Sequence, residues 1–195
     1  MHIGFILDGN GRWASNKSLP RSIGHKKGAE NVEEILKSCR DLGISNVTLY
    51  AFSTENWSRP VFEIKALMKL FHYYLKKKLT MLYQENVKVV IIGDINPFPK
   101  VIKGYIKNLE ELTKNNDGMV LNLAMNYGGR SEIVRATKGI AKAVSDGILK
   151  IEDLDEDLFA QYLYTDGQKD PDLIIRTAGE KRLSNFLLWQ SAYSE

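Results

Sequence analysis

The sequence predicts an α/β fold with a mainly parallel sheet, flanked by helices on both faces, and a ligand site at the carboxyl ends of the strands beside an apolar tunnel. Short apolar runs rich in β-branched residues alternate with longer amphipathic segments, as in parallel sheets whose faces are covered by helices. Loops rich in glycine and arginine follow these runs, and ligands gather at that edge of such sheets.

Composition fits one domain. The chain has 195 residues, of which 44% are apolar and 26% charged, and we expect a single domain over residues 1–195. A net charge of +3 is too small to indicate nucleic-acid binding. The single cysteine, Cys39, shares an apolar helix face and suits a reducing compartment, so we expect a cytoplasmic location.

The expected elements follow in chain order from their periodicity. Strands are predicted at residues 3–7, 47–52, 87–92, 120–125 and 173–175, where apolar runs end in turn residues. Helices are predicted at residues 26–42, 62–85, 100–114, from 130 to about 146, 157–164 and 185–192, where apolar residues recur at helical spacing.

The first turn has the outline of a phosphate site. Asp8 ends the first predicted strand, and Gly9 and Gly11 let backbone N–H groups approach an anion before Arg12. A carboxylate beside phosphate oxygens implies Mg²⁺ between them. Taken alone, the glycine pattern fits a plain strand-to-helix turn about equally well.

Arginines after the strands suggest two anion sites. Arg176 and Arg182, with Ser184, are expected to hold one diphosphate, and Gly9 to Arg12 with Arg21 another. Arg21 also fits an exposed turn, and His25 a capping or surface position.

Three further side chains leave alternatives open. Asn56 lacks a basic lone pair, so we expect it to orient a substrate or act through water. Trp13 and Trp57 fit half-buried packing or contact with apolar substrate atoms. The acidic run 152–157 is interpreted as a helix N-terminus with a solvated flank, not a metal site.

The predicted helix 62–85 carries a wide apolar ridge. The ridge fits a core helix and the wall of an apolar tunnel equally well, and the small Ala51 just before it would leave space. It consists of Ile64, Leu67, Met68, Phe71, Leu75, Leu79 and Leu82, with Leu70 and Tyr74 beside it.

Several motifs resemble those of the cis-prenyltransferases, in the expected order along the whole chain. They include DGNGRW at 8–13, GH at 24–25, LYAFSTENW at 49–57, RP at 59–60, NYGGR at 126–130, DLIIRT at 172–177, Glu180 and RLSNF at 182–186. The resemblance implies an enzyme that adds isopentenyl diphosphate to an allylic diphosphate such as farnesyl diphosphate, with cis geometry. We expect a polyprenyl diphosphate product, such as undecaprenyl diphosphate for a cell-wall lipid carrier.

The resemblance also assigns roles to residues. Asp8 and Glu195 match Mg²⁺ ligands, and Asp8 and Asn56 match catalytic residues, Asn56 being the one usually given the proton-acceptor role. The substrate-binding matches are Gly9, Asn10, Gly11, Arg12, Trp13, Arg21, His25, Ser53, Thr54, Glu55, Trp57, Arg59, Arg176, Arg182, Leu183 and Ser184.

Further expectations concern assembly and location. The family implies a homodimer and transient contact with the membrane surface, at the inner face, for release of an apolar product. Family members continue past the position of Glu195 with another strand and a tail, which this sequence lacks. A non-catalytic subunit that binds prenyl diphosphates beside an active partner is the alternative, and the presence of Asp8, Asn56 and both arginine loops argues against it.

Overall fold

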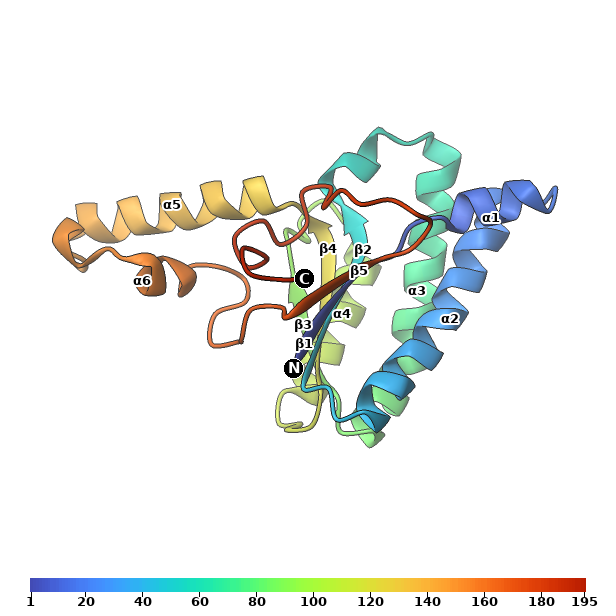
Figure 1. Ribbon diagram of the computed structural model, residues 1–195, viewed down its shortest axis with the longest axis horizontal. Coiled ribbons are helices and arrows are strands. Elements are labelled where there is room, and N and C mark those ends of the chain that lie inside the picture. Colours follow the sequence, from blue (N-terminus) through green and yellow to red (C-terminus); the bar gives the residue numbers. More distant parts are fainter.

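Five strands form a single parallel sheet. The computed structural model describes residues 1–195, except for the side chains of residues 78 and 79. The strand order is β3-β4-β2-β1-β5, and every neighbouring pair is parallel (Figure 1). The strands are β1 (His2–Ile6), β2 (Asn46–Ser53), β3 (Lys88–Ile92), β4 (Val120–Tyr127) and β5 (Leu173–Arg176), so all five predicted strands are confirmed.

Helical segments connect the strands. The α-helices are α1 (Asn10–Asn16), α2 (Arg21–Asp41), α3 (Val61–Gln84), α4 (Lys100–Thr113), α5 (Gly129–Ser145) and α6 (Glu156–Ala160). Two short 3₁₀ helices, η1 (Thr54–Ser58) and η2 (Ile151–Asp153), lie after β2 and before α6. Proline precedes α2, α3 and α4 in an extended conformation, which lets the chain turn directly into each helix.

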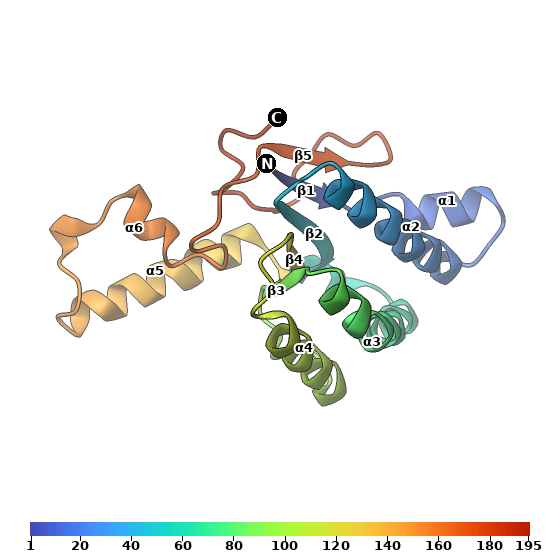
Figure 2. The same ribbon diagram turned by 90° about the horizontal axis from the view of Figure 1, so that it is seen from below.

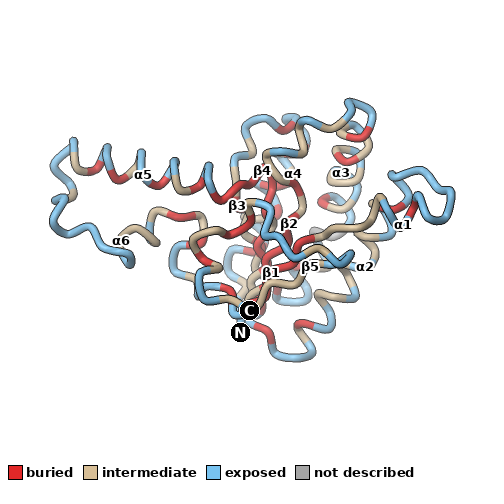
Figure 3. Tube along the Cα trace, turned by 45° about the horizontal axis from the view of Figure 1, so that its top comes forward, coloured by how far each residue is buried: buried red, intermediate tan, exposed pale blue. Residues whose placement is uncertain are grey.

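The two faces of the sheet are covered differently. Helices α2, α3 and α4 lie against one face (Figure 2), and the main core forms there around Val47, Leu49, Leu121 and Ile106. The other face packs against the C-terminal segment, whose Phe186 and Leu187 are fully buried. Burial is therefore concentrated along the strands (Figure 3), while the outer sides of the helices are exposed.

Helix α5 leaves the sheet and forms an arm. It extends away from the other helices and is followed by α6 at the far end (Figure 1). Glu132 near its beginning is buried and accepts hydrogen bonds from the Tyr127 hydroxyl at 2.5 Å and the Tyr164 N–H at 2.7 Å. The first contact joins the start of the arm to the end of β4, and the second joins it to the segment after α6.

The predicted helix at 185–192 is wrong. Residues 185–192 form a succession of turns, because Asn185 and Leu187, like the preceding Ser184, adopt positive φ angles between 42° and 64° that a right-handed helix excludes. The predicted helix at 157–164 is shorter than expected: α6 ends at Ala160 and turns follow. Helix α1 was anticipated only as a helix start, and α2 begins five residues before the predicted position, at Arg21.

The α/β class with a parallel sheet is confirmed. Because all strands run the same way, the loops after β1, β2, β4 and β5 meet at one edge. Most candidate residues lie in these loops or in the helices that follow them, so the topology brings together side chains that are far apart in the sequence.

Candidate active site

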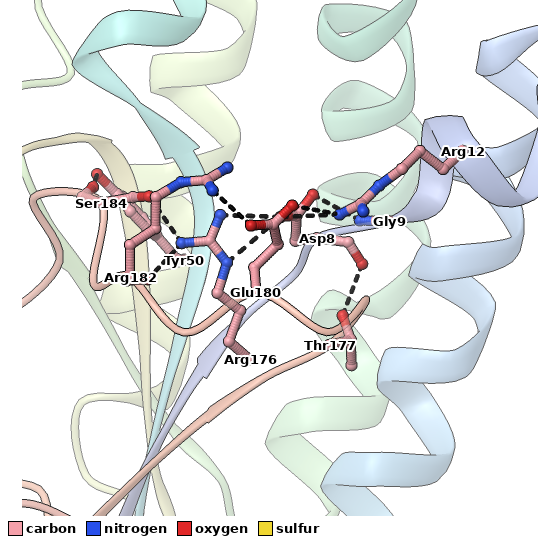
Figure 4. Close-up of polar contacts among 9 residues, drawn as sticks. All are labelled: Asp8, Gly9, Arg12, Tyr50, Arg176, Thr177, Glu180, Arg182 and Ser184. Atoms are coloured by element: carbon pink, nitrogen blue, oxygen red, sulfur yellow. Dashed lines mark hydrogen bonds and ion pairs between the residues drawn. The ribbon is translucent and has the colours of Figure 1, made fainter.

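Asp8 lies at the centre of the polar contacts at this edge. Its Oδ2 accepts hydrogen bonds from Arg176, at 2.8 Å from Nη2 and 3.3 Å from Nε, and lies 3.5 Å from Nη2 of Arg12 (Figure 4). Its Oδ1 accepts the Gly9 N–H at 2.6 Å. Burial alone would raise the pKa of Asp8, but Arg176, the Gly9 N–H and Arg12 together hold it below its ordinary value. The carboxylate is therefore ionised at neutral pH.

Gly9 makes the turn between β1 and α1 possible. It has a φ of 89°, and a Cβ at this position would lie 2.6 Å from the Ala178 Cβ, so a larger residue would be both strained and crowded. Beside it, the Thr177 hydroxyl donates to the Asp8 carbonyl oxygen at 2.6 Å. The loops after β1 and β5 are thus joined directly.

The loop after β5 carries the second group of predicted residues. Arg176 Nη1 donates to the Ser184 Oγ at 2.7 Å and also to the Arg182 carbonyl oxygen. The Glu180 carboxylate forms ion pairs with two guanidinium groups. It lies 2.5 Å from that of Arg182 and 3.3 Å from that of Arg12. The structure therefore brings Asp8, Arg12, Arg176, Arg182 and Ser184 together.

Glu63, which was not predicted, organises a third cluster. It is only 4% exposed and lies 3.0 Å from Arg59, 3.4 Å from His25 and 3.7 Å from Arg21. Burial lowers the pKa of His25; Glu63 opposes this shift, while Arg59 and Arg21 add to it. The four-residue spacing from Arg59 to Glu63 could have indicated that pair, but the contact with α2 has no local signal.

The loop after β2 contributes through η1. Asn56 accepts the Ser53 N–H on its Oδ1 at 3.3 Å, so this amide orients its own loop. Glu55 accepts a hydrogen bond from the Asn185 amide at 2.9 Å. The Trp57 indole donates to Asn126 Oδ1 at 2.9 Å and its ring packs against Phe52 and Phe98. Trp57 was expected either to pack in a half-buried position or to contact apolar substrate atoms, and the structure shows packing.

An apolar cavity of about 230 Å³ opens beside these residues. It lies between the sheet and the helices α2 and α3. Asn10, His25, Asn56 and Arg59 line its polar part. The apolar lining includes Ala51, Val32, Leu36, Leu67, Leu70, Phe71, Tyr74, Leu75, Leu82, Leu109 and Leu121.

The ridge of α3 therefore serves both as core and as cavity wall. Leu67, Leu75 and Leu82 are buried and also line the cavity, whereas Met68 packs against the core without lining it. The side chain of Leu79, another predicted member of the ridge, lies outside the described residues.

Four predicted residues lie toward solvent or away from Asp8. Trp13 and Leu183 are partly exposed, and Thr54 borders a smaller pocket near Asp94. The backbone of Glu195 pairs with Asp172 and Ile174. Ile174 is opposite Gly4, four residues before Asp8, so Glu195 is displaced along the strands by about 13 Å. The structure does not bring these two carboxylates together within one chain, and the role of Glu195 stays a prediction.

The family is settled by comparison with known proteins. A family model described as "Putative undecaprenyl diphosphate synthase" matches residues 6–195, nearly the whole chain. The chain belongs to this prenyltransferase family. The resemblance to the cis-prenyltransferases that was expected from the sequence is confirmed at the level of the family.

Curated relatives agree with the family match. The isoprenyl transferase of Clostridium tetani is 55% identical over this entire chain and 76% of its own length. That of Bacillus subtilis is 53% identical, with 75% of its length covered. The ditrans,polycis-undecaprenyl-diphosphate synthase ((2E,6E)-farnesyl-diphosphate specific) of Buchnera aphidicola is 49% identical, with 78% covered.

Solved structures show the same fold. The crystal structure of lavandulyl diphosphate synthase from Lavandula x intermedia, in complex with dimethylallyl diphosphate, is 38% identical and has a TM-score of 0.96. It is matched over this entire chain and 84% of its own. A probable undecaprenyl diphosphate synthase from Campylobacter jejuni is 34% identical, with a TM-score of 0.79 over 82% of its chain.

Proposed function

We propose that this prenyltransferase condenses isopentenyl diphosphate onto an allylic diphosphate, farnesyl diphosphate being the expected primer. The product would be a cis-polyprenyl diphosphate of the undecaprenyl type. The observation that carries the proposal is the Asp8–Arg176 pair, at 2.8 Å, close to the polar residues that line an apolar cavity. Such an arrangement places charged diphosphates beside a space suited to their hydrocarbon chains.

Asp8 fits a magnesium site that substrate completes. Mg²⁺ is commonly held by one or two carboxylates together with substrate phosphates. The Asp8 side chain is ionised and 29% exposed, and the described residues contain no cluster of three potential ligands that would hold the ion without substrate. When bound, Mg²⁺ would offset negative charge on the departing diphosphate.

The remaining chemistry is assigned to side chains of this chain. Gly9 to Arg12, with Arg21 and His25, would bind the allylic diphosphate, and Arg176, Arg182 and Ser184 the isopentenyl diphosphate. Guanidinium groups and N–H donors stabilise the diphosphate as its bond to the allylic carbon breaks. The isopentenyl double bond forms the new carbon–carbon bond, and a proton leaves the carbon beside it.

We infer that the departing diphosphate accepts this proton. Asn56 has no basic lone pair near neutral pH, and its Oδ1 already accepts the Ser53 N–H. Asn56 lines the cavity near His25 and Arg59, which suits a role in orienting the substrate.

Activity tests the proposal directly. The chain is incubated with labelled isopentenyl diphosphate, farnesyl diphosphate and Mg²⁺, and the extracted product is sized by chromatography. Asp8→Asn should lower kcat/KM by about a hundredfold or more, because the substituted amide cannot hold the cation. Asp166→Asn, which removes an exposed aspartate, is the matched control and should leave kcat/KM unchanged. Full activity of Asp8→Asn would contradict the assignment.

The same assay addresses the alternative of a non-catalytic subunit. A subunit of that kind would bind the diphosphates without consuming them, so tight binding with no product would favour it. The Asp8–Arg176 pair and the cavity support catalysis instead.

Assembly and location are further parts of the proposal. Exposed apolar side chains on the arm, at Val134, Ile148 and Ile151, support a homodimer, which light scattering after size exclusion would detect. None of the described helices has the length and apolar character needed to cross a bilayer. We expect a cytoplasmic protein that meets the inner membrane surface transiently to release its product.

A further inference from the structure

The segment from Gly9 to Ala29 has an unusual charge balance. It contains no aspartate or glutamate but five lysines and arginines, namely Arg12, Lys17, Arg21, Lys26 and Lys27. In the structure these residues belong to α1, the following turn and the first turns of α2, which pack against each other at one end of the molecule (Figure 1). We call residues 13–27 the basic corner.

The basic corner also presents apolar side chains to solvent. Trp13, Leu19 and Ile23 are 39%, 39% and 40% exposed. Phe62, at the start of α3, is 74% exposed and precedes Glu63, which pairs with Arg21 of α2. Apolar groups therefore extend from the basic corner to the adjacent end of α3.

Two lysines of the basic corner, Lys17 and Lys26, form no ion pair with a described side chain. Lys27 pairs with Glu30, and Arg21 with Glu63. Among the described side chains, no carboxylate is within ion-pair distance of Lys17 or Lys26. The Lys17 ammonium instead lies 4.7 Å from the centre of the Trp13 ring, so a cation and an aromatic ring are exposed together.

The corner adjoins the apolar cavity. Asn10 of α1 and His25, Gly28 and Ala29 of α2 line the cavity, so its wall and the basic corner are built from the same two helices. An apolar product leaving the cavity beside α2 would reach this surface first.

We propose that the basic corner, with Phe62, docks on an anionic phospholipid surface. Lysines are attracted to anionic headgroups, and tryptophan, leucine and isoleucine insert at the boundary with the acyl chains. The exposed, unpaired lysines favour this partner over an apolar protein groove, since they would be left without counter-charges there. The inference deepens the proposed function, because it identifies where an apolar product would pass to the bilayer.

Vesicle binding without substrates tests the inference. The complete chain is sedimented with vesicles of phosphatidylcholine alone, or of phosphatidylcholine with phosphatidylglycerol, at low and high salt. We expect binding to the anionic vesicles only, weakened by salt. The double variant Lys17→Glu/Lys26→Glu should lower the partition coefficient roughly thirtyfold or more.

A matched variant controls for net charge. Lys138→Glu/Lys142→Glu makes the same charge change on exposed residues of α5, at the other end of the molecule, and should bind like the unmodified protein. Leu19→Ser/Ile23→Ser should also weaken binding, and brominated lipid should quench Trp13 emission, a signal that Trp13→Phe removes. Circular dichroism confirms that each variant is folded.

The outcomes separate this inference from the proposed function. Absence of binding to anionic vesicles, or equal losses in the α5 control, would overturn the inference even if condensation proceeds. Binding to an oligonucleotide but not to vesicles would also overturn it. If the unmodified chain binds vesicles but makes no product, the proposed function fails and the docking surface stands.

Discussion

Individual residues at the site make their contacts with partners that are distant in the sequence. Asp8 and Arg176 are 168 residues apart, and Glu63 joins residues of α2 to the loop after β2. A buried carboxylate fixes the directions of the two guanidinium groups and the imidazole that contact it. The positions of Arg21, His25 and Arg59 therefore depend on Glu63.

Glu63→Gln should raise the KM for the allylic diphosphate roughly tenfold, with a smaller effect on that for isopentenyl diphosphate. The amide keeps the shape of the side chain but gives up its charge-assisted contacts with Arg59 and His25. Steady-state kinetics with each substrate varied in turn measures the difference.

Glu111→Gln is the control for this variant. Glu111 forms an exposed ion pair with Lys114 at the C-terminal end of α4, and exposed pairs of this kind contribute little to stability. Equal changes in both KM values for Glu63→Gln would contradict the proposed positioning of the allylic site.

At the scale of elements, α1 and α2 approach closely because Gly24 lacks a side chain. A Cβ at Gly24 would lie 2.0 Å from the Asn10 carbonyl oxygen, which belongs to the backbone and cannot rotate away. The same contact involves Asn10, whose side of α1 lines the cavity. Helix packing and site geometry are therefore coupled here.

Gly24→Ala should lower the free energy of unfolding by about 1–3 kcal/mol, since α1 has to shift. Gly104→Ala in α4 is the matched comparison, because a Cβ there meets nothing within 4 Å. It should stabilise the protein by about 1 kcal/mol through helix propensity. Denaturant unfolding measures the free energy of unfolding of both variants. An unchanged value for Gly24→Ala would show that α1 and α2 can separate at little energetic cost.

Asn185 joins three elements. Its Oδ1 accepts the Arg130 N–H at 2.9 Å, and its Nδ2 donates to Glu55 at 2.9 Å, while its own φ is 64°. Burial would raise the pKa of Glu55, but the Asn185 amide helps to hold it below its ordinary value.

Asn185→Asp should reduce kcat/KM more than Asn185→Gly does. The aspartate puts a second carboxylate beside Glu55 and raises its pKa, whereas glycine accepts the positive φ and introduces no charge. Kinetics from pH 5 to pH 8 would show the difference, with the aspartate variant recovering in acid. If both variants lost kcat/KM equally at every pH, Asn185 would act only through its backbone conformation.

Across the whole molecule, the His2 side chain connects β1 to β2 and to the loop before β5. It is buried, with Nδ1 2.7 Å from the Lys169 carbonyl oxygen and Nε2 2.7 Å from the Thr48 hydroxyl. The carbonyl can only accept, so Nδ1 carries the proton and the hydroxyl donates to Nε2. Burial lowers the pKa of His2, although the Lys169 carbonyl and Asp172 oppose the shift.

Stability should therefore fall as the pH drops from 7 toward about 5.5. The unfolded chain protonates His2 near its ordinary pKa of about 6.5, while the folded chain holds the ring neutral to lower pH, so protons favour unfolding. His25, whose pKa is also lowered, contributes with the same sign.

The His2→Gln variant should show a shallower dependence of unfolding free energy on pH, whereas His72→Gln, at an exposed position, should match the unmodified protein. Urea unfolding at several pH values measures the slopes. An unchanged slope in His2→Gln would remove His2 from this role.

Local patterns predicted the parallel sheet well because buried strands have a continuous apolar signal that depends little on distant contacts. The five strands, the long helix α3 and the buried Cys39 were all expected. The turns at 185–192 were not, since their apolar residues recur at helical spacing. In the structure Ser184, Asn185 and Leu187 have positive φ angles, and Phe186 and Leu187 pack against the sheet.

The fold class, the family and the loops expected to carry the chemistry could be predicted from the sequence, because each prediction depends on short-range pattern or motif. Only the folded molecule shows that Glu63 contacts Arg21, His25 and Arg59, that Trp57 packs into the core and that Glu195 lies away from Asp8. The physical reason is that these contacts depend on strand order and helix packing, which set the distances between residues that no local spacing relates.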